Sequence, residues 1–419
     1  MDNITEIIKR RLKVLWNITS TPGQGATRLP FSEEGKQAAQ YLLNEMQRAG
    51  LYAWIDTVGN VRGILPATLD NTEKDNVKTI LMGSHYDTVK NGGEFDGAAG
   101  VICALSVVEY IKANCPVRKH NLEIIAFNDE EGCMFGSGCL GSKTLTGQVD
   151  QYYIEHLIDE NGISIKEWIQ KWNADSNDLC KEKLDLTKIY GFFEIHIEQG
   201  PVLDQEKLDL GIVTGIVGLL RGMVEVRGQA DHAGTTPMNM RKDAIEISAK
   251  VISDLDAMAV EQKDGSVATC GFIRAYPNAM NVIAEKTEFT IDLRSINQHS
   301  IDVMENRIRK ILDEKTQSCN AAYDIDVKLR QKPVFMDESF VKTLGQKCRD
   351  HEYKYKKIVS GAAHDAMIFA DKVPTAMVFV PSIQGRSHCP DERSDYSQLA
   401  KAAKIVYETI GDLMAKEEA

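Results

Sequence analysis

Residues 79–100, TILMGSHYDTVKNGGEFDGAAG, decide the fold. The run at 77–82 is mostly apolar and β-branched, so it predicts a buried strand, and His85 and Asp87 follow where that strand should end. Side chains two residues apart on an extended chain face the same way, so these two can act as a metal ligand and as the carboxylate that orients its ring. Beyond a glycine-rich turn, Asp96 can reach back as a second oxygen ligand. Taken alone, the segment fits an ordinary strand, turn and helix with a capping Asp96 equally well.

The composition narrows the class of protein. The 419 residues exceed what one hydrophobic core usually covers, so two domains are expected. A net charge of −12 argues against nucleic acid or an anionic membrane as the main partner. The sequence has no membrane-spanning apolar run and no start typical of a signal peptide, so we expect a cytoplasmic protein. Its nine cysteines include no CxxC pair and are expected to be reduced thiols.

Outside its middle part, the chain alternates apolar strands with helical patterns. Strands are expected at 77–82, 122–127, 192–197 and 374–380, and helices at 4–16, 33–49, 97–114, 337–353 and 399–415. This alternation predicts an α/β fold with a mostly parallel sheet and helices on both faces. We assign these segments to one catalytic domain, made of residues 1–211 and 331–419.

The middle of the chain follows a different pattern. A long strand pair or one bent strand is expected at 214–228, followed by strands at 266–276, 286–294 and 321–329, with helices at 241–260 and 300–315. The order βαββαβ is typical of an α+β sandwich with helices on one face of an antiparallel sheet. We therefore expect an inserted lid or dimerisation domain at 212–330, whose edge strands offer a route to dimerisation.

Metal-binding side chains lie at or just beyond the ends of the four apolar strands. They are His85 and Asp87, then Glu130 and Glu131, then His196, and last His388. In open α/β sheets ligands bind at the carboxyl ends of strands, so these side chains are expected to converge. Three imidazoles with several carboxylates suit zinc, manganese, cobalt or nickel better than calcium, and Asp96 can bridge two ions. Each residue by itself also fits a commoner role, such as a solvated acidic turn or a core histidine.

Seven motifs strengthen this expectation. They are SHYDTVKNGGEFDG at 84–97, NDEEG at 128–132, EIHIEQGPVLD at 194–204, DHAGTTPMNMRKDA at 231–244, PNAMNVI at 277–283, SGAAHDA at 360–366 and GRSHCPDE at 385–392. In combination they resemble the amidase, hydantoinase and carbamoylase family, which belongs to the clan of binuclear aminoacylases and carboxypeptidases. Members of that family include N-carbamoyl-L-amino-acid hydrolases, allantoate amidohydrolases and β-ureidopropionases. The resemblance covers nearly the whole chain.

The resemblance implies two divalent metal ions in each subunit. His85, Asp96 and His196 would hold one ion. Asp96, Glu131 and His388 would hold the other, so that Asp96 bridges the two.

The resemblance also implies roles for residues that hold no ion. Glu130 would be the general base that takes a proton from the attacking water, and Asp87 would support His85. The substrate-binding residues would be Gln199, His232, Asn281, Arg294 and, through its backbone, Gly361. His232 would reach the partner subunit's site in a homodimer and donate to the oxyanion, while Arg294 and Asn281 clamp a substrate carboxylate.

The activity implied is hydrolysis of a linear amide or ureido C–N bond. The expected substrate is an N-carbamoyl-L-amino acid, which would yield the amino acid, carbon dioxide and ammonia, and the alternative substrate is allantoate. An aminoacylase or dipeptidase would use the same metals, whereas a non-catalytic binding protein would have lost a ligand or the base. The chain departs from the family pattern at Ala284, Ala363, Arg386 and Cys389, and Arg386 adds a cation near the expected site.

Overall fold

Two sheets organise the computed structural model, which describes residues 3–68, 77–172 and 179–415. The chain divides into two units. Unit 1 comprises Met1–Thr214, Phe335–Ile358 and Ala363–Ala419, and unit 2 comprises Gly215–Val334 and Val359–Ala362. Within the described ranges, no helix is both long enough and apolar enough to cross a membrane.

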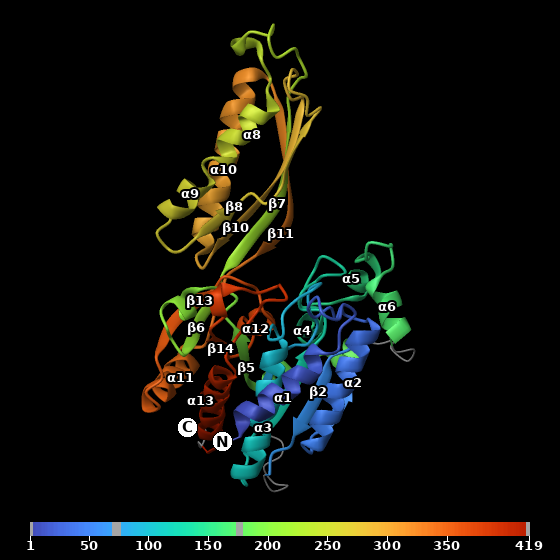
Figure 1. Cartoon of the computed structure of the whole chain (residues 1–419), viewed down its shortest axis with the longest axis vertical. Helices are drawn as coiled ribbons and strands as arrows, with labels where there is room; N and C mark the ends of the chain where they lie inside the picture. The colour runs from blue at the N-terminus through green and yellow to red at the C-terminus, as the bar shows by residue number, and fades with distance from the viewer. Residues whose placement is uncertain (1–2, 69–76, 173–178, 416–419) are drawn as a thin grey trace. The chain divides into compact units, whose positions relative to one another are not determined.

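Unit 1 is built around the larger sheet, which has nine strands in the described chain (Figure 1). Its strands are β1 (Tyr52–Ile55), β2 (Val61–Leu65), β3 (Thr79–His85), β4 (Asn121–Phe127), β5 (Ile189–Ile197), β6 (Leu210–Ile216), β12 (Val334–Phe335), β13 (Tyr355–Ser360) and β14 (Thr375–Val380). Its main helices are α1 (Ile4–Trp16), α2 (Glu33–Arg48), α3 (Ala98–Asn114), α4 (Leu140–Leu145), α5 (Gln151–His156), α6 (Ile165–Trp172), α7 (Val202–Gln205), α11 (Glu338–Asp350), α12 (Asp365–Ala370) and α13 (Tyr396–Ala415).

Four neighbouring parallel strands form the centre of this sheet. The strand order is β1-β2-β4-β3-β5-β14-β6-β12, with β13 paired to β6, and the strands from β4 to β14 all run the same way. His85 lies opposite Phe127 and His196 opposite Phe379, so the carboxyl ends of these strands meet at one edge. The expected α/β class is therefore confirmed. The flanking strands β2 and β6 pair antiparallel, which the apolar runs alone do not predict.

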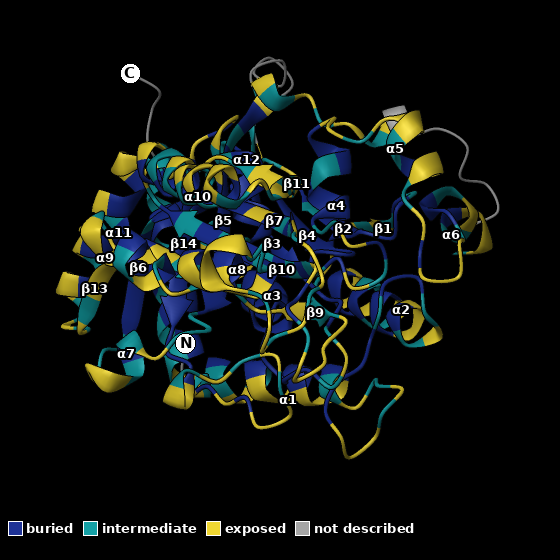
Figure 2. Ribbon diagram, turned by 90° about the horizontal axis from the view of Figure 1, so that it is seen from above, coloured by how far each residue is buried: buried dark blue, intermediate teal, exposed yellow. Residues whose placement is uncertain are grey.

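Helices cover both faces of the parallel strands. Every residue of β3 after Thr79 is buried, as is every residue of β14. Because successive side chains of a strand point to opposite faces, a continuous buried run requires cover on both sides. Figure 2 shows α1 and α3 on one side of these strands and α4 and α12 on the other. Loops, not helices, follow directly after the carboxyl ends of these strands.

Unit 2 contains the second sheet, with helices packed on one of its faces. Its elements are β7 (Gly218–Arg227), α8 (Ala244–Ile252), α9 (Leu255–Glu261), β8 (Val267–Thr269), β9 (Ile273–Tyr276), β10 (Lys286–Ser295), α10 (Gln298–Cys319) and β11 (Ala322–Gln331). The strand order is β11-β7-β10-β8, with β9 also paired to β10, and every pairing is antiparallel. Side chains of β10 alternate strictly between buried and half-buried, so one face alone forms the core.

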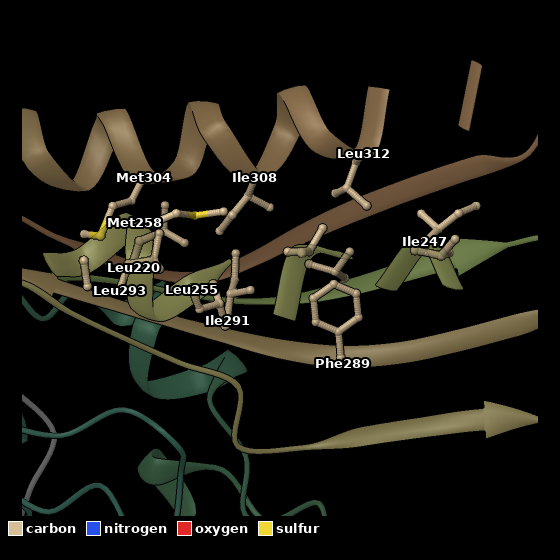
Figure 3. Close-up of a cluster of buried hydrophobic side chains, with 14 of the residues drawn as sticks. Leu220, Ile247, Leu255, Met258, Phe289, Ile291, Leu293, Met304, Ile308 and Leu312 are labelled. Atoms are coloured by element: carbon tan, nitrogen blue, oxygen red, sulfur yellow. The ribbon is translucent and has the colours of Figure 1, made fainter. Parts of the chain in front are cut away.

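The core of unit 2 lies between α10 and this buried face. Met304, Ile308 and Leu312 recur at helical spacing on α10, and Figure 3 shows them on the side that faces the strands. Phe289 and Ile291 of β10 are among the fully buried side chains that they meet. This core belongs to unit 2 alone, so the second sheet has its own packing.

Two expected elements of unit 2 are interrupted, which corrects the sequence prediction. The helix expected at 241–260 is two helices, and Asp254 lies at the break, where its carboxylate accepts bonds of 2.6 and 2.7 Å from Arg307. The strand expected at 266–276 is also two strands, because two main-chain N–H groups of the intervening loop donate to the Thr290 hydroxyl at 3.2 and 3.1 Å. Strand β13 goes unpredicted because its sequence, YKKIVS, is partly exposed and lacks an apolar run.

Candidate metal centre

The five predicted metal ligands come together at the carboxyl edge of the parallel strands, all within unit 1. His85 ends β3 and His196 lies one residue before the end of β5, whereas Asp96, Glu131 and His388 lie on loops. Their ligand atoms form two groups, His85–Asp96–His196 and Asp96–Glu131–His388, and within each group the atoms lie within 4.8 Å of one another. These are the two sets that the resemblance implies.

Asp96 lies between the two groups. Its Oδ1 atom is 3.3 Å from His196 Nε2 and 3.7 Å from His85 Nε2. Its Oδ2 atom is 3.1 Å from His388 Nε2, which in turn lies 3.4 Å from Glu131 Oε1. One carboxylate therefore presents one oxygen to each group, as a ligand that bridges two ions must.

Two buried carboxylate oxygens at this centre have the surroundings expected of cation ligands. Asp96 Oδ1 and Glu131 Oε1 are buried, and neither has a hydrogen-bond partner in the described chain. Buried carboxylate oxygens are costly unless a donor or a cation compensates them. The Nδ1 atoms of His85 and His196 lie 3.1 and 2.9 Å from main-chain oxygens, which leaves their Nε2 atoms as ligands. The donor set therefore fits a divalent cation that accepts mixed nitrogen and oxygen ligands.

The loop that carries Asp96 approaches His85 so closely that only glycine fits beside the ring. Gly97 has a φ of +61°, and a Cβ atom built on it would lie 2.4 Å from His85 Nδ1. A side chain here would therefore meet both backbone strain and a steric clash. The glycine is a requirement of the ligand geometry.

Asp87 ties the first ligand to the acidic turn after β4. Its side chain is fully buried, and its two carboxylate oxygens accept the main-chain N–H groups of Glu130 and Glu131 at 3.1 and 3.2 Å. Its Oδ1 atom also lies 3.6 Å from His85 Nδ1. The Asp87 carboxylate thus fixes the backbone of the two glutamates, and the main-chain oxygen of Asp87, 3.1 Å from Nδ1, holds the imidazole.

Glu130 lies beside both sets of ligands and forms a further group with His85 and Glu131, whose possible ligand atoms lie within 4.8 Å of one another. Its Oε2 atom is 3.8 Å from His85 Nε2, and Cys139 Sγ lies 3.9 Å from its Oε1 atom. Burial raises the pKa of Glu130 well above its ordinary value, and the charges of Glu131 and Asp365 add to this effect. A carboxylate with a raised pKa is suited to exchange a proton near neutral pH.

The protonation preferences of the ligands reflect the crowding of charges. Burial raises the pKa of Glu131, and it lowers the pKa of His196 to about 4. A hydrogen bond to Asp96, together with the nearby Glu131 carboxylate, raises the pKa of His388 to about 11. Burial disfavours the charged forms of Glu131 and His196, whereas the carboxylates around His388 favour its protonated form. A bound divalent cation would replace the proton of His388.

Gln199 also lies at the centre. Its Nε2 atom is 3.1 Å from Asp96 Oδ2 and 3.2 Å from His388 Nε2, and its main-chain N–H donates to Ser382 Oγ at 3.0 Å. Among the residues implied to bind substrate, it is the one that the structure brings into contact with the ligands. The other four lie in unit 2.

Arg294 and Gly361 line a cavity of ≈ 460 Å³ within unit 2. Arg294 donates to Gly361 O at 2.7 Å, and to the two oxygens of Asp292 at 2.8 and 3.2 Å. Arg221, on the same cavity wall, donates twice to Asp292 Oδ2, at 3.0 and 2.9 Å. Two guanidinium groups share one carboxylate, so the cavity keeps one surplus positive charge.

His232 and Asn281 lie on adjoining loops of unit 2. His232 forms an isolated bridge with Val282, and the N–H of Ala233 donates to Asn281 O at 3.0 Å. The exposed ring of His232 accepts two main-chain N–H groups at Nδ1, at 3.0 and 3.2 Å. The neutral ring must therefore carry its proton on Nε2, where it can donate to another molecule.

Sequence reasoning assigned no role to two buried residues beside the ligands. His364 packs against His196 with ring centroids 4.4 Å apart and the ring planes tilted by 58°, and Glu392 accepts the main-chain N–H of Asp96 at 3.1 Å. His364 lies in the motif SGAAHDA and Glu392 in GRSHCPDE. A short polar stretch does not indicate which of its side chains is buried. Arg386, noted as a nearby cation, is exposed and pairs with Asp391 at 3.2 Å.

Comparisons with known proteins agree with this geometry. A model of the peptidase family M20/M25/M40 matches residues 81–412. The chain is 36% identical over 387 residues to the N-carbamoyl-L-amino-acid amidohydrolase of Paenarthrobacter aurescens, covering 92% of this chain and 93% of that protein. It is 34% identical over 406 residues to the allantoate amidohydrolase of Escherichia coli, covering 96% of each. The crystal structure of an amidase of the hydantoinase/carbamoylase family from Burkholderia multivorans superposes with a TM-score of 0.89 at 26% identity, covering 99% of this chain and 98% of that one.

Proposed function

Because the chain belongs to the peptidase family M20/M25/M40, we propose that it is a metal-dependent amidohydrolase that cleaves the carbamoyl C–N bond of N-carbamoyl-L-amino acids. The products would be the amino acid, carbon dioxide and ammonia. The observation that carries the proposal is Asp96, which presents one oxygen to His85 and His196 and the other to His388. The resemblance read from the sequence motifs is confirmed by the family match and by the curated relatives.

Two divalent ions per subunit are part of the proposal. His85, Asp96 and His196 would hold the first ion, and Asp96, Glu131 and His388 the second. The two groups of ligand atoms and the unpaired carboxylate oxygens support this assignment. The mixed nitrogen and oxygen donors favour zinc, manganese, cobalt or nickel.

The chemistry follows from the residues around these ligands. When bound, the ions would lower the pKa of a water molecule and polarise the substrate carbonyl. Glu130 would take the proton of the attacking water and return it to the leaving nitrogen, a role that its burial and raised pKa support. Asp87 would hold His85 and the backbone of Glu130 in place, and Nε2–H of His232 would donate to the developing oxyanion.

The substrate carboxylate would bind in the cavity of unit 2. Arg294 is held there by Asp292 and by Gly361 O, which limits the rotamers of its guanidinium group. Arg221 neutralises Asp292, so the positive charge of Arg294 remains available to an anion. Asn281 and Gln199 would add polar contacts to the same substrate. Allantoate also carries a carboxylate and is the second candidate, since a curated relative is an allantoate amidohydrolase.

The larger organisation is proposed on the same basis. Residues 1–211 and 331–419 would form the catalytic domain, and residues 212–330 a lid or dimerisation domain of a homodimer in which His232 serves the partner subunit's site. An antiparallel sheet with a free edge in unit 2 supports a dimerisation role. A cytoplasmic location is supported by the cysteines, since every one whose side chain the structure describes is a free thiol.

A substrate panel tests the function. The metal-free protein is loaded with zinc, manganese, cobalt or nickel and given N-carbamoyl amino acids, allantoate, N-acetyl amino acids and dipeptides. Ammonia release from a carbamoyl amino acid, ahead of the other classes in kcat/KM, supports the proposal. Faster ammonia release from allantoate selects the second candidate, and cleavage of acyl amino acids or dipeptides alone would reject both.

A further inference from the structure

Glu392 connects two loops that each carry a metal ligand. Its Oε1 atom accepts the main-chain N–H groups of Phe95 and Asp96, at 2.9 and 3.1 Å. Its Oε2 atom accepts the hydroxyl of Ser387, the residue before His388, at 2.7 Å. One side chain is therefore bonded to the backbone of the bridging carboxylate and to the neighbour of the last imidazole.

The environment of Glu392 is unusual for a carboxylate. The side chain is fully buried, and no lysine, arginine or histidine in the described ranges forms an ion pair with it. A buried charge without a counter-ion is costly. Here two main-chain N–H groups and one hydroxyl donate hydrogen bonds to the carboxylate and offset part of that cost. Gly93 makes room for it, because a Cβ atom at that position would lie 2.0 Å from Glu392 Oε1. The fold therefore keeps a buried carboxylate at position 392 although its desolvation is unfavourable.

The two sets of ligands differ in what holds them. His85 and His196 belong to strands β3 and β5, which pair directly with each other. The second set, Asp96, Glu131 and His388, lies entirely on loops. No strand pairing aligns Asp96 with His388, and Glu392 joins the loops of these two residues.

We propose that Glu392 is a positioning residue for the second ion, because its carboxylate fixes the loop of Asp96 against the loop of His388. The inference rests on the proposed function, in that it takes the Asp96–Glu131–His388 group to be an ion site. Asp96 belongs to both sets, but the first ion also has two imidazoles that lie on paired strands. Loss of Glu392 is therefore expected to weaken the second ion more than the first. A residue that only stabilised the fold would not discriminate between the ions.

Zinc titration of the metal-free full chain tests this inference. Each protein competes with a chromophoric chelator for Zn²⁺, and the measurement gives the number of bound ions and both dissociation constants. We expect two ions in the wild type, and in Glu392→Ala a second dissociation constant raised about tenfold or more, the usual scale for the loss of a group that orients a ligand. The readout is metal binding, so it is separate from whether the chain cleaves any substrate of the panel.

Three further variants separate positioning from charge and from general stability. In Glu392→Gln the amide oxygen can still accept both N–H groups, and the amide nitrogen can donate to Ser387, so two ions should bind nearly as in the wild type. Ser387→Ala removes one link only and should weaken the second ion less than Glu392→Ala does. Glu45→Ala removes another buried glutamate, one that is bonded to Arg11 and Arg48, and should leave both constants unchanged.

Several results would overturn the inference. These are wild-type affinity for both ions in Glu392→Ala, an equal loss of both ions, or a wild type that binds one ion only. If Glu392→Gln lost the second ion as Glu392→Ala does, charge and not positioning would be the cause. If Glu392→Ala failed to fold, Ser387→Ala would decide the question. An unchanged dissociation constant for the second ion in that variant would show that the bond between Ser387 and Glu392 does not position it.

Discussion

His85 and His196 point their Nε2 atoms at each other across 3.4 Å, while the Nδ1 atom of each ring lies against a main-chain oxygen. Because a carbonyl oxygen can only accept, each neutral ring carries its proton on Nδ1 and presents a lone pair at Nε2. Two lone pairs held this close repel each other unless a proton or a metal ion compensates them, and the carboxylates of Asp96, Glu130 and Asp87, acting against burial, raise the pKa of His85 well above its ordinary value. The structure therefore fixes the two rings in the arrangement that a metal ion would stabilise.

Gly97→Ala should abolish binding of the first ion. The added Cβ atom would lie 2.4 Å from the His85 ring, and the residue would have to keep a φ of +61°, so the loop must move and take Asp96 with it. Metal analysis after dialysis checks this outcome, with Gly162→Ala as the control, because that glycine also has a positive φ but has open space around it. Normal metal content in Gly97→Ala would contradict the close packing described here.

Glu130→Gln should reduce kcat by about 10²-fold or more, since the variant removes the group that takes the proton. Metal content should stay close to that of the wild type if Glu130 is the base and not a ligand. A large loss of metal would instead assign it to the third group of possible ligands, His85–Glu130–Glu131. Steady-state kinetics and metal analysis on the same preparation check both parts. Near-normal turnover would show that another group is the base.

Mixing two inactive variants should restore part of the activity. If His232 serves the partner subunit's site, a mixed dimer of His232→Ala and Glu130→Gln protomers contains one site in which both residues are intact. Activity is measured after subunits have been exchanged, and exchange is verified with differently tagged chains. No recovery in verified mixed dimers would mean that His232 acts within its own subunit or not at all.

Arg294→Lys should lose about 10²-fold in kcat/KM, because a single ammonium group cannot keep the bonds to Asp292 and Gly361 and also pair with a carboxylate in one orientation. Arg227→Lys, also in unit 2, makes the same change at an exposed arginine that pairs with Glu225 and should behave as the wild type. Equal cleavage of a free acid and its amide by the wild type would argue against the clamp and direct attention to Arg386.

Asp56 should make the free energy of unfolding depend on pH. Burial raises its pKa from 3.8 to about 7, although Asn60 and the main chain donate hydrogen bonds to it. Between these values the folded state holds a proton that the unfolded state has lost, so this group's contribution to stability is greatest below pH 3.8 and is lost as the pH rises through about 7. Urea unfolding at several pH values checks the slope, which Asp56→Asn should reduce. An identical slope in the variant would mean that the carboxyl is not protonated in the fold.

Much of the architecture of unit 1 could be predicted because its central strands are continuous apolar runs. A run such as LEIIAF at 122–127 has few alternatives to a buried strand, and parallel order brings the residues after each strand to one edge. That rule alone places Glu131 and His388 near His85, although they come from distant parts of the chain. The antiparallel flanks could not be predicted in this way, because pairing direction depends on partners that a single strand does not specify.

Other features depend on contacts that no local pattern records. At the break between α8 and α9, Asp254 is bonded to Arg307 of α10, and no pattern in the sequence indicates that these two residues are partners. Glu392 lies in a polar stretch that resembles a solvated loop, and its burial results from the loop of Asp96 folding against it. Long-range polar contacts of this kind determine the details of the site, whereas hydrophobic periodicity determines the layers.

The order of ligands along the chain has a consequence for biosynthesis. His85, Asp96 and His196 are all translated before unit 2, whereas β14, which pairs with β5, and the loop with His388 are translated after it. On the ribosome, the first trio can assemble while the second still lacks its imidazole. Closing the sheet requires β14 to find β5 across the whole of unit 2, a slow, long-range step in folding. The ligands of the proposed second ion are therefore complete only after synthesis has passed His388.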